Sequence, residues 1–136
     1  MSQNWVKDIN EMHTKFGVRE ATNKLSPNML AEYLDFRIKF LQEELDETKN
    51  AVRTGDAEEV VDGLIDLCVV AIGTLDAYGV NAEEAWNKVF VANMAKEVGI
   101  KESRPNPYGL PDLIKPEGWQ APSHAGNHGI IEKALD

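Results

Sequence analysis

The 136-residue chain contains a single cysteine, Cys68, and no long hydrophobic run. One cysteine cannot form an intrachain disulfide, which excludes a disulfide-stabilised secreted scaffold and fits a reducing cytoplasm. No segment approaches the roughly 18 consecutive apolar residues that span a membrane. The first residues also lack the apolar centre of a signal peptide. We therefore expect a cytoplasmic protein that does not enter membranes.

Positive charge is scarce as well. The chain has 14 Lys and Arg residues against 23 Asp and Glu residues, and its net charge is −9. Such a charge disfavours nucleic acid and anionic membrane surfaces as partners, so we expect neither. It permits a cation site, provided that the acidic residues are gathered in one place rather than scattered over the surface.

The alternation of strands and helices that marks α/β proteins is missing, and apolar residues recur instead at helical spacing. Four helices are predicted, over residues 3–16, 26–54, 56–78 and 81–99. The connections between them are short, so neighbouring helices should pack antiparallel. Beyond the fourth helix the chain is rich in Pro and Gly and has no lasting periodicity. The expected fold class is all-α, with a four-helix bundle in residues 1–99 and an extended arm in residues 100–136.

The third predicted helix carries acidic residues in an unusual setting. Apolar residues surround nearly its whole circumference, which is typical of a buried helix. One narrow stripe differs and contains Glu59, Asp62 and Asp66, next to Gly63 and Gly73, which allow close approach to the backbone. Buried carboxylates on one line repel each other, and each costs several kcal/mol to desolvate unless its charge is compensated. Since the helix supplies no Lys or Arg partner, we expect a divalent cation beside this stripe.

The second predicted helix offers further carboxylates. Its segment QEELDET contains Glu43, Glu44 and Glu47, and the last two share one helical face. If the second and third helices pack antiparallel, Glu44 and Glu47 can face Glu59 and Asp62. A site made of carboxylates alone selects hard cations, so Mg²⁺ is the expected metal, with Mn²⁺ as a substitute.

Other interpretations of these residues stay open or are weaker. An acidic run on a helix is usually solvated surface, and Asp66 could bridge helices as a polar core residue. The Glu-x-x-His motif of di-iron bundles and the EF-hand loop do not occur in the sequence. His124 and His128, in the segment HAGNH, lack the cysteines and the third ligand of a zinc site, so we interpret them as solvated residues of the arm.

Five short motifs follow one another along the chain. They are His-x-x-Phe-Gly (His13, Phe16, Gly17), EExxE (Glu43, Glu44, Glu47), ExxDxLxD (Glu59, Asp62, Leu64, Asp66), Asn-Met-x-Lys (Asn93, Met94, Lys96) and Lys-Pro-x-Gly-Trp (Lys115, Pro116, Gly118, Trp119). These motifs are spread along most of the chain. In them the sequence resembles the MazG-like all-α nucleoside triphosphate pyrophosphohydrolases. It is most similar to the small single-domain proteins of this type from phages and bacteria.

The resemblance implies a function and a set of roles. The reaction would be Mg²⁺-dependent hydrolysis of a (deoxy)nucleoside triphosphate, for example dGTP, dCTP or dUTP, to the monophosphate and pyrophosphate. Glu44, Glu47, Glu59 and Asp62 would hold the metal, which neutralises charge on the triphosphate and activates water. Glu43 would act as the catalytic base. The residues expected to bind the substrate are His13, Arg37, Asp66, Asn93, Lys96, Lys115 and Trp119.

The resemblance also implies a homodimer or homotetramer whose site is completed by a neighbouring subunit. The apolar circumference of the third helix agrees, because short neighbouring helices would leave it partly uncovered. If a phage encodes the protein, it would act in the host cytoplasm. The competing function is a non-catalytic helical module that binds nucleotides or another protein. A third interpretation is a Mg²⁺ site that only holds the bundle together. The preferred base, and activity on the alarmone ppGpp, stay open.

Overall fold

The computed structural model describes residues 4–103, 108–109 and 112–135. These residues are mostly helical, as expected for the all-α class. The chain forms two compact units, Met1–Ala82 with Gly126–Asp136, and Glu83–Ala125. Neither boundary coincides with residue 99, where the sequence suggested the end of the helical domain, so the division into a catalytic domain and an arm stays a prediction. No helix within the described ranges is long and apolar enough to cross a membrane.

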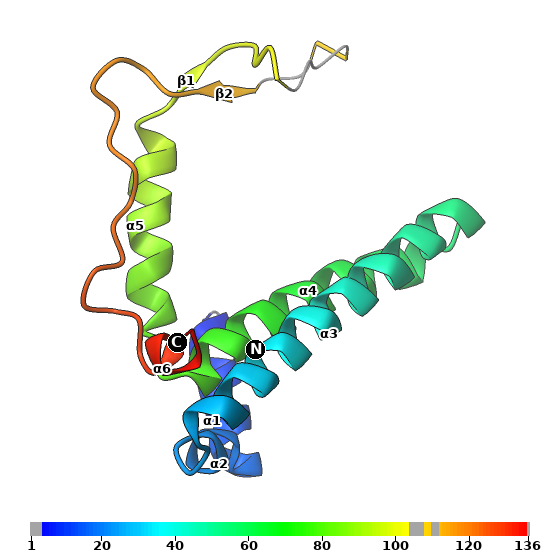
Figure 1. The fold of residues 1–136 in the computed structure, drawn as a ribbon. Coiled ribbons are helices and arrows are strands. Elements are labelled where there is room, and N and C mark those ends of the chain that lie inside the picture. Colours follow the sequence, from blue (N-terminus) through cyan, green and yellow to red (C-terminus); the bar gives the residue numbers. More distant parts are fainter. Residues whose placement is uncertain (1–3, 104–107, 110–111, 136) are drawn as a thin grey trace. The chain divides into compact units, whose positions relative to one another are not determined.

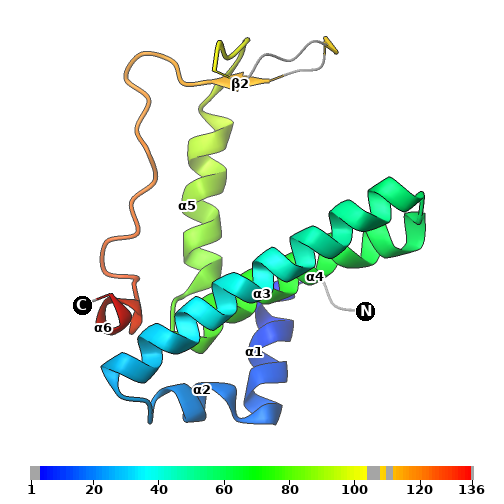
Figure 2. The same ribbon diagram turned by 45° about the vertical axis from the view of Figure 1, so that its right-hand side comes forward.

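The first unit is built on a long helical hairpin. Helices α3 (Pro27–Thr54) and α4 (Ala57–Ala77) lie side by side and run in opposite directions (Figure 1). Helices α1 (Trp5–Phe16) and α2 (Val18–Thr22) contact α4, and the short α6 (Ile131–Ala134) contacts α3. Figure 2 shows the closed end of the hairpin projecting beyond α1 and α2. That end of the hairpin therefore has only its own two helices as cover within the described part of the unit.

Local sequence signals explain the hairpin. The Ser26 hydroxyl caps the start of α3, and Pro27 occupies the first helical position, where its missing N–H is not needed. α3 ends at Gly55, whose φ of 75° is the left-handed conformation that favours glycine. Asp56 then caps α4 through its side chain. This two-residue connection returns α4 directly along α3, which is the antiparallel arrangement expected from the short loop.

The C-terminal residues return to the first unit. Leu30, Ala77, Tyr78 and Ala134 form a buried apolar cluster, and the Tyr78 hydroxyl donates to the Leu30 carbonyl. The Ile130 amide donates to the Tyr78 carbonyl at 2.8 Å. Burial of Ala134 and its neighbours thus fixes the last turn of chain onto the first unit, while the extended arm over residues 100–136 stays a prediction.

The second unit consists of a helix, a short hairpin and a returning segment. Helix α5 (Ala82–Met94) leads into strand β1 (Glu97–Val98), which pairs antiparallel with β2 (Leu113–Ile114). The Trp119 indole Nε1 donates to the Ala92 carbonyl at 2.7 Å, so the chain after β2 runs back along α5 (Figure 1). The paired residues of the hairpin are Glu97 with Ile114 and Val98 with Leu113.

The predicted helices agree with the structure except at the fourth. Helices α1, α3 and α4 correspond to the predictions over residues 3–16, 26–54 and 56–78. The fourth, predicted over residues 81–99, ends at Met94 because the residues that follow enter the β hairpin. The four-helix bundle stays a prediction, since α5 belongs mainly to the second unit.

Candidate active site

The three glutamates predicted on α3 differ in exposure. Glu43 and Glu47 are exposed, whereas Glu44 is half-buried. Thr48 and Ala51, one and two turns further along the helix, are buried. The Thr48 hydroxyl donates to the Glu44 carbonyl at 2.7 Å. Glu44 therefore lies at the edge of the contact between α3 and α4, and its neighbours on either side point to solvent.

The acids of α4 are less buried than the sequence suggested. Glu59 and Asp62 are exposed, and Asp66 is half-buried. The apolar neighbours Val61 and Leu64 are 64% and 52% exposed. The expectation of a helix enclosed on all sides is therefore wrong for this half of α4 in the single chain. The reason is that α1 and α2 contact the C-terminal part of the helix and leave the N-terminal part to α3.

Carboxylates from both helices converge around Glu44. Partial burial raises the pKa of Glu44 above its ordinary value of 4.5, and the charges of Glu47, Asp66, Asp62 and Glu43 raise it further. Two of these four acids lie on α4 and two on α3. The helical hairpin thus brings the EExxE and ExxD segments together in space.

The acids of the two segments have no ion-pair partners among the described residues. There are six of them: Glu43, Glu44, Glu47, Glu59, Asp62 and Asp66. In the described part of the chain, none of them forms an ion pair with Lys, Arg or His. Carboxylates gathered in this way attract cations, and their oxygen atoms are the ligands that Mg²⁺ prefers. Among the described residues, no three His, Cys, Asp or Glu side chains lie close enough to hold one ion, and Glu59 is not among the charges acting on Glu44. The donor chemistry fits Mg²⁺, but the side chains do not form a closed ligand shell.

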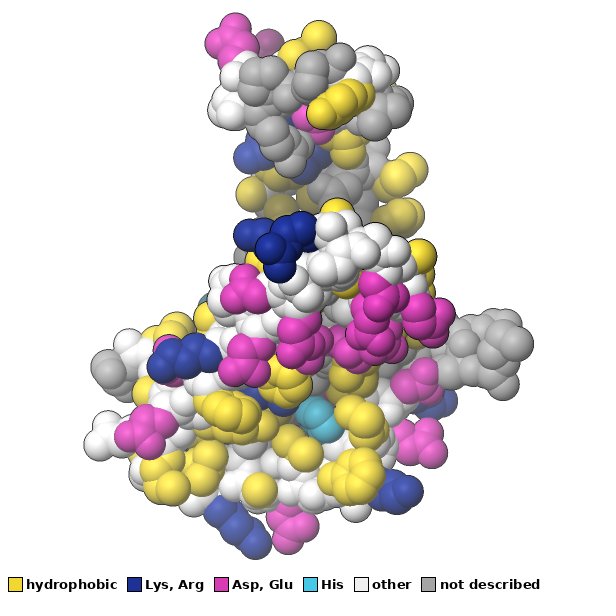
Figure 3. All heavy atoms as spheres, turned by 90° about the vertical axis from the view of Figure 1, so that its right-hand side faces the viewer, with side chains coloured by type: hydrophobic (Ala, Val, Ile, Leu, Met, Phe, Trp, Pro, Cys, Tyr) yellow, Lys and Arg dark blue, Asp and Glu magenta, His cyan; other side chains and the backbone are white. Residues whose placement is uncertain are grey.

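A cavity of about 250 Å³ adjoins the acids. Glu44 and Asp66 belong both to the group of carboxylates and to the wall of this cavity. Figure 3 shows acidic side chains gathered on one face, with hydrophobic side chains and a histidine beside them. Apolar walls with a few polar groups are typical of small-molecule sites. The remaining lining residues are Met12, His13, Arg37, Phe40, Val69 and Val70.

Arg37 reaches from α3 to α4 at this cavity. Its Nε donates to the Thr74 hydroxyl and its Nη2 to the Val70 carbonyl, both at 3.0 Å. Its guanidinium carbon lies 5.7 Å from the centre of the Phe40 ring. No carboxylate pairs with it within the described residues. Neutral groups therefore hold the guanidinium, and its positive charge is left for an anionic ligand.

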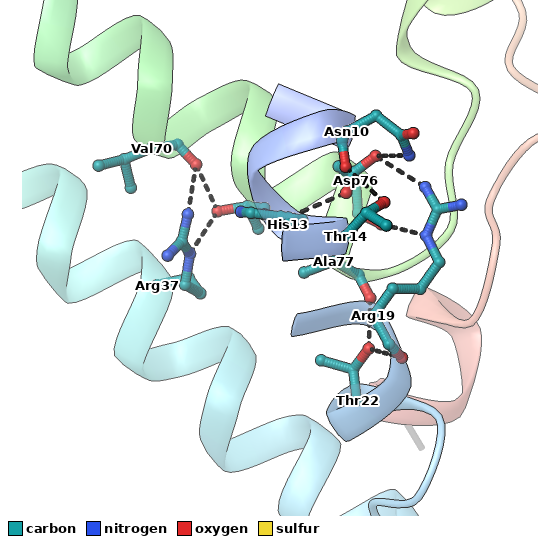
Figure 4. Close-up of polar contacts among 10 residues, drawn as sticks. Asn10, His13, Thr14, Arg19, Thr22, Arg37, Val70, Asp76 and Ala77 are labelled. Carbon is teal, nitrogen blue, oxygen red and sulfur yellow. Dashed lines mark hydrogen bonds and ion pairs between the residues drawn. The ribbon is translucent and has the colours of Figure 1, made fainter. Parts of the chain in front are cut away.

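His13, on α1, is 6% exposed and is held by Asp76 at the end of α4. The imidazole Nδ1 lies 2.9 Å from Asp76 Oδ2. Asp76, itself 4% exposed, also accepts hydrogen bonds on Oδ1 from Asn10 Nδ2 at 3.0 Å and Arg19 Nη2 at 2.7 Å. Figure 4 shows His13 between this carboxylate and Arg37. Three donors, one of them a guanidinium, compensate the buried charge of Asp76.

Comparison with known families identifies the chain. Residues 9–93 match the sequence model of phosphoribosyl-ATP pyrophosphohydrolase, and the match covers more than half of the chain. The chain belongs to the phosphoribosyl-ATP pyrophosphohydrolase family. It is a nucleotide pyrophosphohydrolase of the all-α MazG-like superfamily, so the predicted resemblance is confirmed. Comparison with curated proteins and with solved structures found no significant match.

The family match spans α1 to α5 but not all of the predicted site. It includes the acids of α3 and α4 and the residues of the cavity wall, as well as Asn93, which is exposed near the end of α5. Lys96, Lys115 and Trp119 lie outside it. These three residues nevertheless meet in the second unit, where the two ammonium groups lie 5.4 Å and 5.0 Å from the centre of the Trp119 ring. Cation–π attraction of this kind gathers two positive charges at one indole.

Asp76, Asn10 and Arg19 were not among the residues predicted to form the pyrophosphohydrolase site. A signal was present, because Asp76 continues the acidic stripe of α4 three residues beyond Gly73, and residues three apart share a helical face. Asn10 precedes His13 by the same spacing on α1. Extending the stripe by one turn would have identified the carboxylate of Asp76. It would not have identified the side chains of α1 and α2 that neutralise its charge.

The two glycines of the stripe admit side chains from neighbouring helices. A Cβ atom at Gly63 would lie 2.2 Å from Thr48 Oγ1. At Gly73 it would lie 2.8 Å from Arg37 Nη2 and 3.4 Å from His13 Nε2. The close approach predicted for these glycines is present in the structure, and it serves the packing of α1 and α3 onto α4.

Proposed function

We propose that the protein hydrolyses (deoxy)nucleoside triphosphates, such as dGTP, dCTP or dUTP, to the monophosphate and pyrophosphate in a Mg²⁺-dependent reaction. Family membership supports a nucleotide pyrophosphohydrolase, and enzymes of this type generally depend on a divalent metal. The observation that carries the proposal is the convergence of carboxylates without ion-pair partners from α3 and α4 around Glu44, beside a cavity lined by a guanidinium that pairs with no described carboxylate. A metal–triphosphate complex needs both kinds of group.

The proposed metal ligands are Glu44, Glu47, Glu59 and Asp62. Their unpaired carboxylates have the chemistry that Mg²⁺ or Mn²⁺ requires. When bound, the metal supplies charge neutralisation on the phosphate oxygens and a more acidic water. Glu43, exposed beside this set, is proposed as the base that takes a proton from the attacking water. The new bond joins the water oxygen to the α- or β-phosphorus, and the bond from that phosphorus to the oxygen bridging the two phosphates breaks. The bridging oxygen leaves with the other product, so the monophosphate and pyrophosphate are released.

The substrate is proposed to enter the cavity with its phosphates toward the acids. Arg37, whose charge is not neutralised by a described carboxylate, can pair with a phosphate oxygen. His13 and Asp66 line the same cavity and can contact the nucleoside. Separately, four residues of the second unit are proposed to bind substrate, on the support of the motif resemblance and of the two ammonium groups that lie at the Trp119 ring. The residues of the second unit in this group are Asn93, Lys96, Lys115 and Trp119.

We also propose that the protein is a homodimer or homotetramer in the cytoplasm, or in the host cytoplasm if a phage encodes it. The support is the exposed apolar surface of α3 and α4 in the single chain, because hydrophobic side chains gain free energy when a partner covers them. Val52, Val61 and Leu64 are each more than half exposed. A neighbouring subunit on this surface would lie next to the carboxylates and could complete the site.

A pyrophosphate-release assay tests the proposal. Purified protein would receive each NTP and dNTP, ppGpp and phosphoribosyl-ATP, with Mg²⁺, Mn²⁺ or EDTA. We expect metal-dependent monophosphate and pyrophosphate, lost in Glu44→Gln. Asp46→Asn is the matched control, since Asp46 is an exposed acid of the same helix that bonds only Gln42 among the described residues. No turnover of any nucleotide by folded, metal-loaded protein would contradict the proposal and favour the alternative, a non-catalytic nucleotide-binding or interaction module.

A further inference from the structure

The two ring nitrogens of His13 lie in different surroundings. Nδ1 is bonded to Asp76, whereas no hydrogen bond engages Nε2 in the described ranges. His13 lines the cavity, and a Cβ atom placed on Gly73 would touch both Nε2 and Arg37 Nη2. Nε2 and the guanidinium therefore face the same small region at the wall of the cavity.

The other partners of Asp76 determine whether His13 must supply a positive charge or only a hydrogen bond to this carboxylate. Arg19 already supplies a positive charge to this carboxylate at 2.7 Å, and Asn10 supplies a further N–H. His13 has only to donate the hydrogen on Nδ1, which the neutral imidazole can do. In that tautomer Nε2 carries a lone pair and accepts hydrogen bonds. The network thus fixes both the orientation of the ring and the character of the nitrogen at the cavity.

We propose that Asp76 is a positioning residue for substrate selection, which holds His13 Nε2 as a hydrogen-bond acceptor for an N–H group of the nucleotide base. This inference rests on the proposed function and names the part of the substrate that this end of the cavity receives. A phosphate oxygen is itself an acceptor and would be repelled by Nε2, so the phosphates would lie toward the acids, with Arg37 rather than His13 as their contact in this part of the cavity. Met12, Phe40 and Val69, which also line the cavity, offer apolar surface to a flat ring.

The substitution Asp76→Asn tests the idea with almost no change of shape. The amide oxygen can still accept from Arg19 and Asn10, which places the amide NH₂ toward His13 Nδ1. An N–H facing Nδ1 requires the other tautomer, with the hydrogen on Nε2. The acceptor at the cavity then becomes a donor, so the preference between bases should change while the acids of α3 and α4 are untouched.

The first readout is the tautomer itself, measured by ¹⁵N NMR of the histidine rings. The chain has three histidines, and His13→Ala assigns the signal of interest. We expect the hydrogen on Nδ1 in the wild type and on Nε2 in Asp76→Asn. Asn10→Ala is the control, because it removes a donor from the same carboxylate without touching the contact with His13. A wild-type hydrogen on Nε2 would overturn the inference.

The second readout is base preference. Pairs such as dCTP with dUTP, and dATP with dITP, exchange an amine for a carbonyl at one position and a ring-nitrogen acceptor for a ring N–H at the next. For the preferred member, we expect Asp76→Asn to lower kcat/KM roughly tenfold to hundredfold, mainly through KM, and to narrow or invert the preference within the pair. The Mg²⁺ dependence of Asp76→Asn and the base preference of Asn10→Ala should stay as in the wild type. An unchanged preference in Asp76→Asn would contradict the role assigned to Asp76.

Two further variants separate the inference from its alternatives. His13→Ala combined with Asp76→Asn should show no larger loss of preference than His13→Ala alone, because Asp76 acts through His13. If Asp76→Asn does not fold, His13→Ala decides the matter: full base preference without the imidazole would overturn the proposal. Wild-type protein that turns over no nucleotide would contradict the proposed function and the selection of bases, while the NMR result would still decide whether Asp76 holds His13.

Discussion

The two ends of α4 place carboxylates in opposite environments. Near its start, Asp62 is exposed and has no ion-pair partner in the part of the chain that the structure describes. Near its end, Asp76 is 4% exposed and accepts hydrogen bonds from Asn10, His13 and Arg19. The same residue type on one helix is therefore available to a cation at one end and already neutralised at the other. Which environment a carboxylate receives depends on the helices packed over it, here α1 and α2.

The cavity lies between these two environments. Glu44 and Asp66 line it with carboxylates, and His13 and Arg37 line it with an imidazole and a guanidinium. The proposed substrate, a metal-bound nucleoside triphosphate, presents a cation held on its phosphate oxygens, the anionic phosphates themselves and a polar ring. The cavity offers carboxylates for the proposed metal, a guanidinium for the phosphates and an imidazole for the ring, which neither end of α4 would provide alone.

The largest expected effect comes from removing a charge at the exposed end. Asp62→Asn should lower metal-dependent pyrophosphate release by about 1000-fold, since a metal ligand contributes several kcal/mol of charge stabilisation. The apo protein should keep or gain stability, because one of several repelling charges has been removed. Activity assays and thermal melting in EDTA measure the two quantities. Unfolding of Asp62→Asn would mean that the acids support the fold, as a purely structural Mg²⁺ site requires.

Much of this arrangement could be predicted because its causes are local. Ser26 and Pro27 start α3, Gly55 ends it, and Asp56 starts α4, so the antiparallel hairpin follows from a few neighbouring residues. The hairpin in turn brings the two acidic segments together, whatever the rest of the chain does. The motif order alone was sufficient to indicate the superfamily that the family comparison confirmed.

The remainder depends on contacts between residues far apart in the sequence. Asp76 is buried because Asn10, His13 and Arg19 come from two other helices, and no spacing within α4 encodes them. For the same reason, apolar periodicity suggested that Glu59 would be buried, although no helix of the described unit other than α3 covers that half of α4. Helical patterns show which side chains could be covered, but not which helix covers them.

The second effect tests the neutralised end. Asp76→Ala should lower the free energy of unfolding by about 3 kcal/mol, because the buried N–H of His13 loses its acceptor and the Arg19 charge loses its partner. Chemical denaturation measures this change. Glu20→Gln is the matched control, since Glu20 is an exposed acid next to Arg19 whose contact with Lys24 is on the surface, and it should leave stability nearly unchanged. A loss no greater than that of the control would show that Asp76 is not the support of α1 and α2 that its contacts indicate.

The smallest effect concerns Glu44, whose pKa is raised by burial and by neighbouring carboxylates. A carboxyl group with a raised folded pKa is stabilising while protonated, and that stability is lost as the pH rises through the folded pKa. In EDTA at neutral pH, Glu44→Gln should therefore be more stable than the wild type. The difference should disappear as the pH falls below the ordinary value of 4.5, where the carboxyl is protonated in both states.

Adding Mg²⁺ should reverse that order at neutral pH. A metal that binds only the folded protein stabilises it by an amount that rises with the logarithm of the metal concentration relative to Kd, and the wild type keeps the carboxylate that the variant lacks. Melting curves of both proteins between pH 4 and 8, with EDTA or with Mg²⁺, make the comparison. A wild type that is the more stable protein in EDTA at neutral pH would show that Glu44 is compensated, like Asp76, by a group of the protein. Glu44 would then resemble Asp76 rather than Asp62. The acids beside the cavity would no longer differ from the neutralised end of α4.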